Sequence, residues 1–199
     1  MDRKDVQILA KDAVYDGYFR IDRYRLRHRR FDGGWTGEVT REVFERGHVA
    51  AVLPYDPERD AVVLIEQFRI GAYAAGAACW LTEIVAGVID DGETAEAVAR
   101  REMEEETGCP VSRLEPIGSY LSSPGGASEH VTLFAGQVDS RKAGGVHGVA
   151  EENEDIRVLV QPWPEVEADL KRGLFTNAAT LIALQWLALN RAELMRRWR

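Results

Sequence analysis

The sequence predicts an α/β (α+β) sandwich with a small antiparallel sheet at its N-terminus. Three observations support this fold class. Short segments with alternating or continuous apolar residues fill positions 6–85, and they predict strands. A helical pattern at 94–107 separates them from later strand patterns. Two further helical patterns follow the last strand, and strands alternating with helices in this order favour a layered fold.

Residues 6–46 read as strands. Residues 18–27 alternate between two faces, Asp32-Gly33-Gly34 predicts a turn, and residues 35–44 predict a second strand. Such a sheet is marginal alone, so we expect it to pack on the rest of the chain or on a second copy. We therefore divide the chain into an N-terminal β subdomain at 1–46 and a main domain at 47–199.

The remaining strands are predicted by short apolar runs between turn signals. We expect them at 48–53, 61–70, 80–85, 117–121, 130–138 and 156–160. Between them, the turn at 55–60, the small-residue segment 71–78 and the acidic segment 144–155 predict loops. One helix is expected from Pro162 or Trp163 to near Gly173, and a longer one from Asn177 to about Arg197.

Composition restricts the function classes. The 199 residues are 45% hydrophobic and 29% charged, as in a globular protein with a substantial core. A net charge of −8 and a pI of about 5.1 argue against a nonspecific nucleic-acid binder. The two cysteines lack metal-ligand spacing, and neither an apolar leader nor a stretch of about 18 apolar residues is present. We expect a cytoplasmic protein with no membrane segment.

The stretch from Gly87 to Cys109 organises the chain. Its first part is a loop, and its second part is a helix that Thr94 can cap and Gly108 can end. Ala95, Ala99 and Met103 recur every four residues and give this helix an apolar strip.

The same helix carries crowded acidic residues. Glu102, Glu105 and Glu106 have the spacing i, i+3 and i+4, so their carboxylates share a face, and Arg101 is placed to pair with Glu105. Repulsion between neighbouring carboxylates costs a few tenths of a kcal/mol per pair, which a divalent cation would offset. Mg²⁺ fits because it takes oxygen ligands and keeps waters for phosphate. The alternative is a solvated acidic helix face, which is common in Glu-rich helices.

The full spacing is Gly-x5-Glu-x7-Arg-Glu-Met-x-Glu-Glu-x-Gly-Cys from Gly87 to Cys109. It resembles the Nudix box, the signature of hydrolases that cleave nucleoside diphosphates linked to another group. Every fixed position is met, with Met103 and a less usual Cys109 at the apolar sites. The resemblance implies the Nudix fold, a mixed sheet between helices, and metal-dependent pyrophosphate hydrolysis.

The resemblance extends to the bacterial ADP-ribose pyrophosphatases, a family within the Nudix hydrolases. Pro124 lies fifteen residues after Cys109, a spacing typical of that family, although a plain turn is the alternative. The stretches 41–48, 66–69, 147–156 and 177–187 are also similar to it. The family is a homodimer with exchanged N-terminal sheets, which suits the small sheet predicted here.

The resemblance also implies roles for individual residues. The metal ligands would be Glu102, Glu106, Glu154 and the backbone carbonyl of Ala86, with Mg²⁺ as the cofactor and Mn²⁺ as a substitute. Glu105 would join them or orient them together with Arg101. Glu152 would be the general base on a mobile loop, the alternative being that residues 151–155 are a solvated acidic loop.

Substrate recognition requires cations for phosphate and a flat surface for adenine. The resemblance makes Arg69 and Arg41 the phosphate and substrate arginines, with Arg41 supplied by the partner subunit. Tyr18 is a candidate for stacking on adenine, although aromatic residues in strands are mostly core. Ser123 and Gly126 would approach the terminal ribose.

These roles predict hydrolysis of ADP-ribose, a small nucleotide sugar, to AMP and ribose 5-phosphate. A rival in the same class is hydrolysis of another nucleoside diphosphate sugar such as GDP-mannose. A non-catalytic nucleotide-sugar sensor and a plain acidic interaction domain are the alternatives outside that class. The complete set of box glutamates disfavours the sensor.

Overall fold

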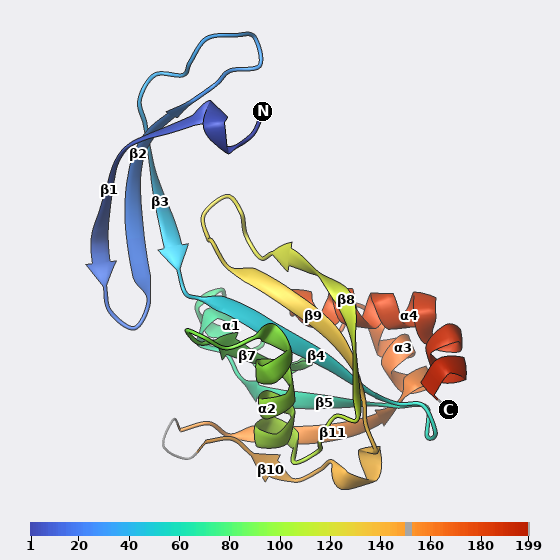
Figure 1. Cartoon of the computed structure of the whole chain (residues 1–199). Coiled ribbons are helices and arrows are strands. Elements are labelled where there is room, and N and C mark those ends of the chain that lie inside the picture. The colour runs from blue at the N-terminus through green and yellow to red at the C-terminus, as the bar shows by residue number, and fades with distance from the viewer. Residues whose placement is uncertain (150–152, 199) are drawn as a thin grey trace. The chain divides into compact units, whose positions relative to one another are not determined.

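A computed structural model describes residues 1–149 and 153–198 of the chain. It divides the chain into two compact units, residues 1–48 with 121–130, and residues 49–120 with 131–199. Figure 1 shows the course of the chain. The strands are β1 (Val6–Asp16), β2 (Arg20–His28), β3 (Val39–Glu45), β4 (His48–Asp56), β5 (Ala61–Phe68), β6 (Trp80–Glu83), β7 (Val85–Ile89), β8 (Arg113–Leu121), β9 (His130–Gln137), β10 (Val146–His147) and β11 (Ile156–Pro162). The α-helices are α1 (Ile70–Ala74), α2 (Ala95–Thr107), α3 (Trp163–Lys171) and α4 (Ala178–Trp198). No helix in the described part of the chain is both long and apolar enough to cross a membrane.

The first unit contains a three-stranded antiparallel sheet in the order β1-β2-β3. Its strands are mostly exposed, but Asp22 on β2 is only 1% exposed and is held by Lys11 at 2.8 Å and Arg20 at 2.7 Å. Because paired charges satisfy this buried carboxylate, the sheet tolerates it. The predicted small antiparallel sheet is therefore present.

The second unit contains a mixed sheet whose main path runs β10-β11-β5-β4-β9-β8. The central strands β4 and β9 pair in parallel, whereas β5 is antiparallel to β4, to β11 and to β6. Strand β7 pairs with β4 next to the chain segment that leads into α2. The predicted mixed sheet between helices is confirmed.

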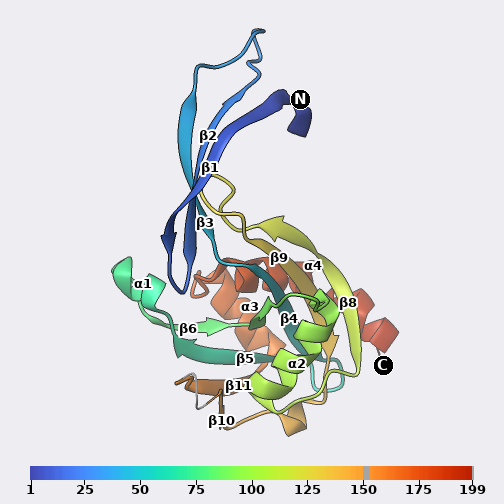
Figure 2. The same cartoon turned by 60° about the vertical axis from the view of Figure 1, so that its left-hand side comes forward.

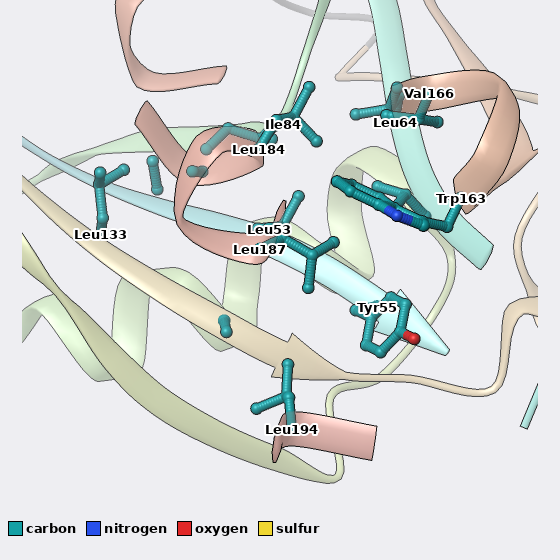
Figure 3. Close-up of a cluster of buried hydrophobic side chains, with 14 of the residues drawn as sticks. Leu53, Tyr55, Leu64, Ile84, Leu133, Trp163, Val166, Leu184, Leu187 and Leu194 are labelled. Carbon is teal, nitrogen blue, oxygen red and sulfur yellow. The ribbon is translucent and has the colours of Figure 1, made fainter. Parts of the chain in front are cut away.

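The two faces of this sheet bury separate apolar clusters. Figure 2 shows α2 on one face and α3 and α4 on the other. Figure 3 shows the cluster beneath α3 and α4, where Leu53 and Leu64 from the sheet meet Trp163, Leu184 and Leu187 from the helices. On the opposite face, residues of α2 pack against alternate positions of β4 and β5. Since both faces are covered, the central strands are apolar along most of their length.

Some predicted elements were wrong in extent or type. The expected strand at 35–44 is only β3 from Val39, because Trp35 pairs with Arg29 only as an isolated backbone bridge. The Trp35 ring lies against the guanidinium groups of Arg27 and Arg29. Strand β1, whose bounds were not predicted within the strand region 6–46, completes the sheet.

Three predicted loops also include residues that the structure places in helices or strands. The segment 71–78 contains most of α1, and β10 lies within 144–155. Strand β4 continues to Asp56, which narrows the predicted turn at 55–60, because Tyr55 and Asp56 pair with Val62 and Ala61 of β5.

Candidate active site

Helix α2 is capped by local interactions at both ends. The Thr94 side chain accepts a hydrogen bond from the Ala97 backbone N–H at 3.2 Å, and Gly108 ends the helix in the left-handed conformation with φ of 65°. Ala99 and Met103 are fully buried on the sheet. With this strip fixed inward, the acidic residues at 102, 105 and 106 have defined positions.

The Arg101 guanidinium organises the acidic side chains. Its Nη1 lies 2.8 Å from Glu102 Oε1 and 2.9 Å from Glu105 Oε2, and its Nε lies 3.5 Å from Glu93. The Glu105 side chain is 43% exposed, whereas that of Glu102 is 14% exposed. Glu105 is therefore on the outer side of the group, and Glu102 is turned inward.

Gly87 permits the inward position of Glu102. A Cβ added at Gly87 would overlap the Glu102 carboxylate and the Cγ that carries it. Strand β7 and helix α2 thus approach each other closely at this carboxylate. The glycine of the motif makes room for the Glu102 side chain here, since Gly87 does not have the positive φ that would otherwise favour glycine.

Glu106 is buried without a cation to balance it. It is 4% exposed, and its Oε2 accepts a 3.3 Å hydrogen bond from the Ala86 backbone N–H. Burial, and then the charge of Glu102, raise the pKa of Glu106 to about 8, although Arg69 opposes the rise. Burial also raises the pKa of Glu102, against the effect of Arg101. No salt bridge to Glu106 is formed within residues 1–149 and 153–198.

These features fit a divalent cation. A buried carboxylate such as that of Glu106, with no salt-bridge partner in the described residues, is unfavourable when ionised, and oxygen ligands suit Mg²⁺ and related ions. In the described residues no three His, Cys, Asp or Glu side chains are gathered closely enough to hold a metal ion. The described residues that fit the ion are thus the carboxylates of Glu102 and Glu106, next to the backbone of Ala86.

Glu154, in the predicted acidic segment, also acts on this pair. The Glu154 Oε2 accepts a hydrogen bond from the Val149 backbone N–H at 3.3 Å, and its charge contributes to the raised pKa of Glu102 and Glu106. Glu154 therefore lies within electrostatic reach of α2. Glu152, the predicted general base, falls outside the described residues.

Arg69 lies at the end of β5, within electrostatic reach of Glu106. Its guanidinium donates to the carboxylate of Glu83, which is 3% exposed. The Glu83 carboxylate also accepts a hydrogen bond from the Asn177 side chain. Sequence reasoning missed Glu83, because it pairs with residues 14 and 94 positions away along the chain.

The other predicted substrate residues belong to the first unit. Tyr18 is 94% exposed and meets Phe19 edge-on with ring centres 4.7 Å apart, which leaves its ring free to stack. The Arg41 guanidinium donates to the backbone oxygen of Thr40 at 2.8 Å. Arg41 therefore has no acidic partner among the described residues.

The segment around Pro124 packs within the same unit. The Gly126 carbonyl accepts a hydrogen bond from the Phe44 N–H at 2.8 Å, and the Ser123 carbonyl accepts one from the Gly126 N–H at 3.0 Å. Arg46 pairs with the buried Glu129 at 3.2 Å. No spacing in the sequence links this pair, because 83 residues separate its members.

Comparison with protein families identifies the fold. The profile of the NUDIX domain matches residues 45–195, which include α2 and the whole Gly87–Cys109 stretch. The chain belongs to the NUDIX domain family. In this NUDIX protein the inward-turned Glu102 and Glu106 are motif positions, so the structural and sequence signals coincide.

Individual relatives narrow the comparison. A protein named ADP-ribose pyrophosphatase from Escherichia coli (strain K12) is 50% identical over 196 residues, which cover 98% of this chain and 94% of that protein. The protein of the same name from Haemophilus influenzae (strain Rd) is 44% identical over 200 residues, covering 99% and 92%. A GDP-mannose pyrophosphatase from Cronobacter sakazakii is 35% identical over 193 residues, covering 93% and 96%.

A solved structure shows the same fold. A crystal structure described as an ADP compounds hydrolase matches with a TM-score of 0.69 at 20% identity and covers 92% of this chain and 95% of that one. At this identity the match shows the fold alone.

Proposed function

We propose that this protein hydrolyses the pyrophosphate bond of ADP-ribose and releases AMP and ribose 5-phosphate. The observation that carries the proposal is the carboxylate pair of the NUDIX motif, the buried Glu106 and the inward-turned Glu102, in a chain half identical to proteins named ADP-ribose pyrophosphatase. Arg101 pairs with Glu102, but Glu106 has no salt-bridge partner in the described residues, and carboxylate oxygens are ligands that a divalent cation takes.

Glu102 and Glu106 would hold the divalent cation, with the Ala86 carbonyl and Glu154 as further ligands. Mg²⁺ is the proposed ion, and Mn²⁺ would substitute. When bound, such an ion neutralises phosphate charge and lowers the pKa of a coordinated water. The hydrogen bond from the Ala86 N–H to Glu106 supports this assignment, since it keeps the carboxylate beside the segment that carries the carbonyl.

Glu152 is the proposed general base, which takes the proton of the attacking water. A base on a loop can reach the water once the substrate is bound. Arg101 and Glu105 would orient the carboxylate of Glu102, as their shared hydrogen bonds suggest.

The predicted substrate contacts complete the proposal. Arg69 would bind the diphosphate and Tyr18 would stack on adenine, while Arg41, Ser123 and Gly126 would contact the rest of the substrate. We also propose a homodimer in which the N-terminal sheet of each subunit serves the other, and a cytoplasmic location. The exposed apolar side chains of β1, including Ile8 and Val14, support pairing with a second copy, and the two free cysteines fit a reducing compartment.

GDP-mannose hydrolysis is the second candidate, because the Cronobacter sakazakii relative of that name covers nearly the whole chain. Its identity of 35% against 50% places it after ADP-ribose hydrolysis. Products released from a panel of nucleotide sugars separate the two, and a preference for GDP-mannose would reverse this order.

The experiment is turnover of ADP-ribose by purified protein with Mg²⁺ and with a chelator in its place. We expect AMP and ribose 5-phosphate only when the cation is present. Glu106→Gln should remove this activity, whereas Glu104→Gln, the same change at an exposed position of α2, should retain it. Full activity with the chelator, or in Glu106→Gln, would contradict the proposed chemistry.

A further inference from the structure

The guanidinium of Arg69 forms hydrogen bonds along only one of its edges within the described residues. Its Nε and Nη2 both donate to Glu83 Oε2, at 3.1 and 2.8 Å. Its Nη1 makes no hydrogen bond within residues 1–149 and 153–198, and the side chain is 42% exposed. One edge of the planar fork is therefore occupied, and the other edge has free donors for a phosphate group.

Glu83 is itself fixed by the start of α4. Its second oxygen, Oε1, accepts a 3.0 Å hydrogen bond from Asn177 Nδ2. The Oδ1 of the same Asn177 accepts hydrogen bonds from the Thr180 backbone N–H at 3.0 Å and the Thr180 hydroxyl at 3.1 Å. Asn177 thus caps α4 with one end of its amide and holds Glu83 with the other.

The network also reaches the segment beside the carboxylate pair. The Ile84 N–H donates to Thr180 Oγ1 at 3.0 Å, and two residues later the Ala86 N–H donates to Glu106. Residues 83–86 are consequently tied to α4 on one side and to α2 on the other. The similarity of residues 177–187 to the family, for which the sequence offered no role, has a physical reason in these contacts.

We propose that Glu83, anchored by Asn177 at the start of α4, is a positioning residue that aims the free edge of Arg69 at the substrate diphosphate. This inference rests on the proposed function, because it takes a diphosphate as the ligand of Arg69. Holding a long side chain before the substrate arrives lowers the entropy lost on binding and fixes the direction of the phosphate contact.

A purely structural counter-ion role makes the opposite prediction. If Glu83 only neutralises a partly buried arginine, then removing its charge frees Arg69 for phosphate, and KM for ADP-ribose falls or stays constant. If Glu83 positions Arg69, its loss raises KM. The direction of the change in KM therefore separates the two roles.

The first test is Glu83→Gln, a change that keeps the size of the side chain. We expect KM for ADP-ribose to rise by about tenfold or more while kcat changes by less than about threefold. Glu115→Gln is the matched control, since Glu115 also pairs with an arginine, Arg197 at 2.6 Å, in another part of the unit. Its kinetic constants should equal those of the wild type. An unchanged or lower KM in Glu83→Gln overturns the proposal.

The second test asks whether Glu83 acts through Arg69. In an Arg69→Ala background, Glu83→Gln should add less than about a twofold further change in KM, because the two residues act as one unit. Asn177→Ser retains a good helix cap but loses the Nδ2 donor, so it should raise KM in the same direction as Glu83→Gln. If the effects of Arg69→Ala and Glu83→Gln on KM are fully additive, or if Asn177→Ser has the wild-type KM, then Glu83 does not act through Arg69 as proposed.

A third measurement does not require turnover. In an NMR spectrum of ¹⁵N-labelled protein, the Arg69 Nε–H should exchange slowly in the wild type and rapidly in Glu83→Gln and Asn177→Ser. Rapid exchange already in the wild type overturns the proposed hold on Arg69. Slow exchange in a wild type that leaves ADP-ribose intact would instead refute the proposed function while retaining the hold.

Discussion

Removal of the Glu106 charge should stabilise the metal-free protein while it abolishes activity. The Glu106 carboxylate is 4% exposed and lies close to Glu102, so its ionised form is disfavoured in the folded state. The substitution Glu106→Gln keeps the size of the side chain and an oxygen to accept the hydrogen bond from Ala86. It therefore removes mainly the buried charge.

The magnitude follows from the two pKa values of this carboxyl, about 8 in the folded chain and 4.5 as its usual value. Between these values the folded state binds a proton that the unfolded state has released, so the free energy of unfolding falls as the pH rises. Compared with a side chain that stays neutral, the Glu106 carboxyl lowers the free energy of unfolding by about 1 kcal/mol at pH 5 and by about 4 kcal/mol at pH 8. The difference of about 3 kcal/mol corresponds to about 6–12 °C in Tm for a chain of this size.

The assay is thermal unfolding of wild type and Glu106→Gln in chelator at pH 5 and pH 8. The advantage of the variant should grow with pH, and Glu105→Gln, at an exposed position on the same helix, should show no such growth. Mg²⁺ should then raise the Tm of the wild type more than that of Glu106→Gln, because a cation that binds the folded state stabilises it. A variant no more stable than wild type at pH 8 would refute the reasoning.

Three further predictions concern single positions. Gly87→Ala should lower kcat/KM by about tenfold or more with Tm changed by less than about 2 °C, because the new methyl group meets side-chain atoms of Glu102, which must move, and no backbone atoms. Gly71→Ala, where nothing lies near the added atom, is the control, and full activity in Gly87→Ala would contradict the close approach of Gly87 to Glu102. Glu152→Gln should lower kcat by about 10²–10⁴-fold with little change in KM, with Glu151→Gln as the comparison, and full rate would reject Glu152 as the base. Gly108→Ala should lower the free energy of unfolding by about 1 kcal/mol, because φ is 65° at this position and the added Cβ would lie 2.9 Å from the His147 ring. Denaturant titration measures this change, and a stability equal to that of the wild type would show that alanine is not strained at this cap.

The elements with local signals were predictable from the sequence. The extent of α2 follows from Thr94 at its start, Gly108 at its end and the apolar strip between them, all of which act within a few residues. The pairing of Arg101 with Glu105 follows from a four-residue spacing on a helix. Strands β4 and β5 were recognisable because both faces are buried and their residues are mostly apolar.

Elements without such signals were missed or misplaced. The bounds of β1 within the predicted strand region 6–46 were not predictable, because the strand is exposed along nearly its whole length and its residues carry no alternation between apolar and polar faces. Helix α1 has five residues, a glycine among them, and no side-chain cap, so nothing local distinguishes it from a loop. The contacts of Glu83 with Arg69 and Asn177 form only when distant segments meet in the fold, and a single sequence does not reveal such pairs.

The central claim is that Glu102 and Glu106 hold a divalent cation against a diphosphate. Diffraction at the manganese absorption edge, from crystals grown with Mn²⁺ and a non-hydrolysable ADP-ribose analogue, tests it most directly. We predict an anomalous peak within coordination distance of both carboxylates and of a phosphate oxygen of the analogue. A manganese ion bound elsewhere, or a diphosphate bound away from these two carboxylates, would contradict the claim.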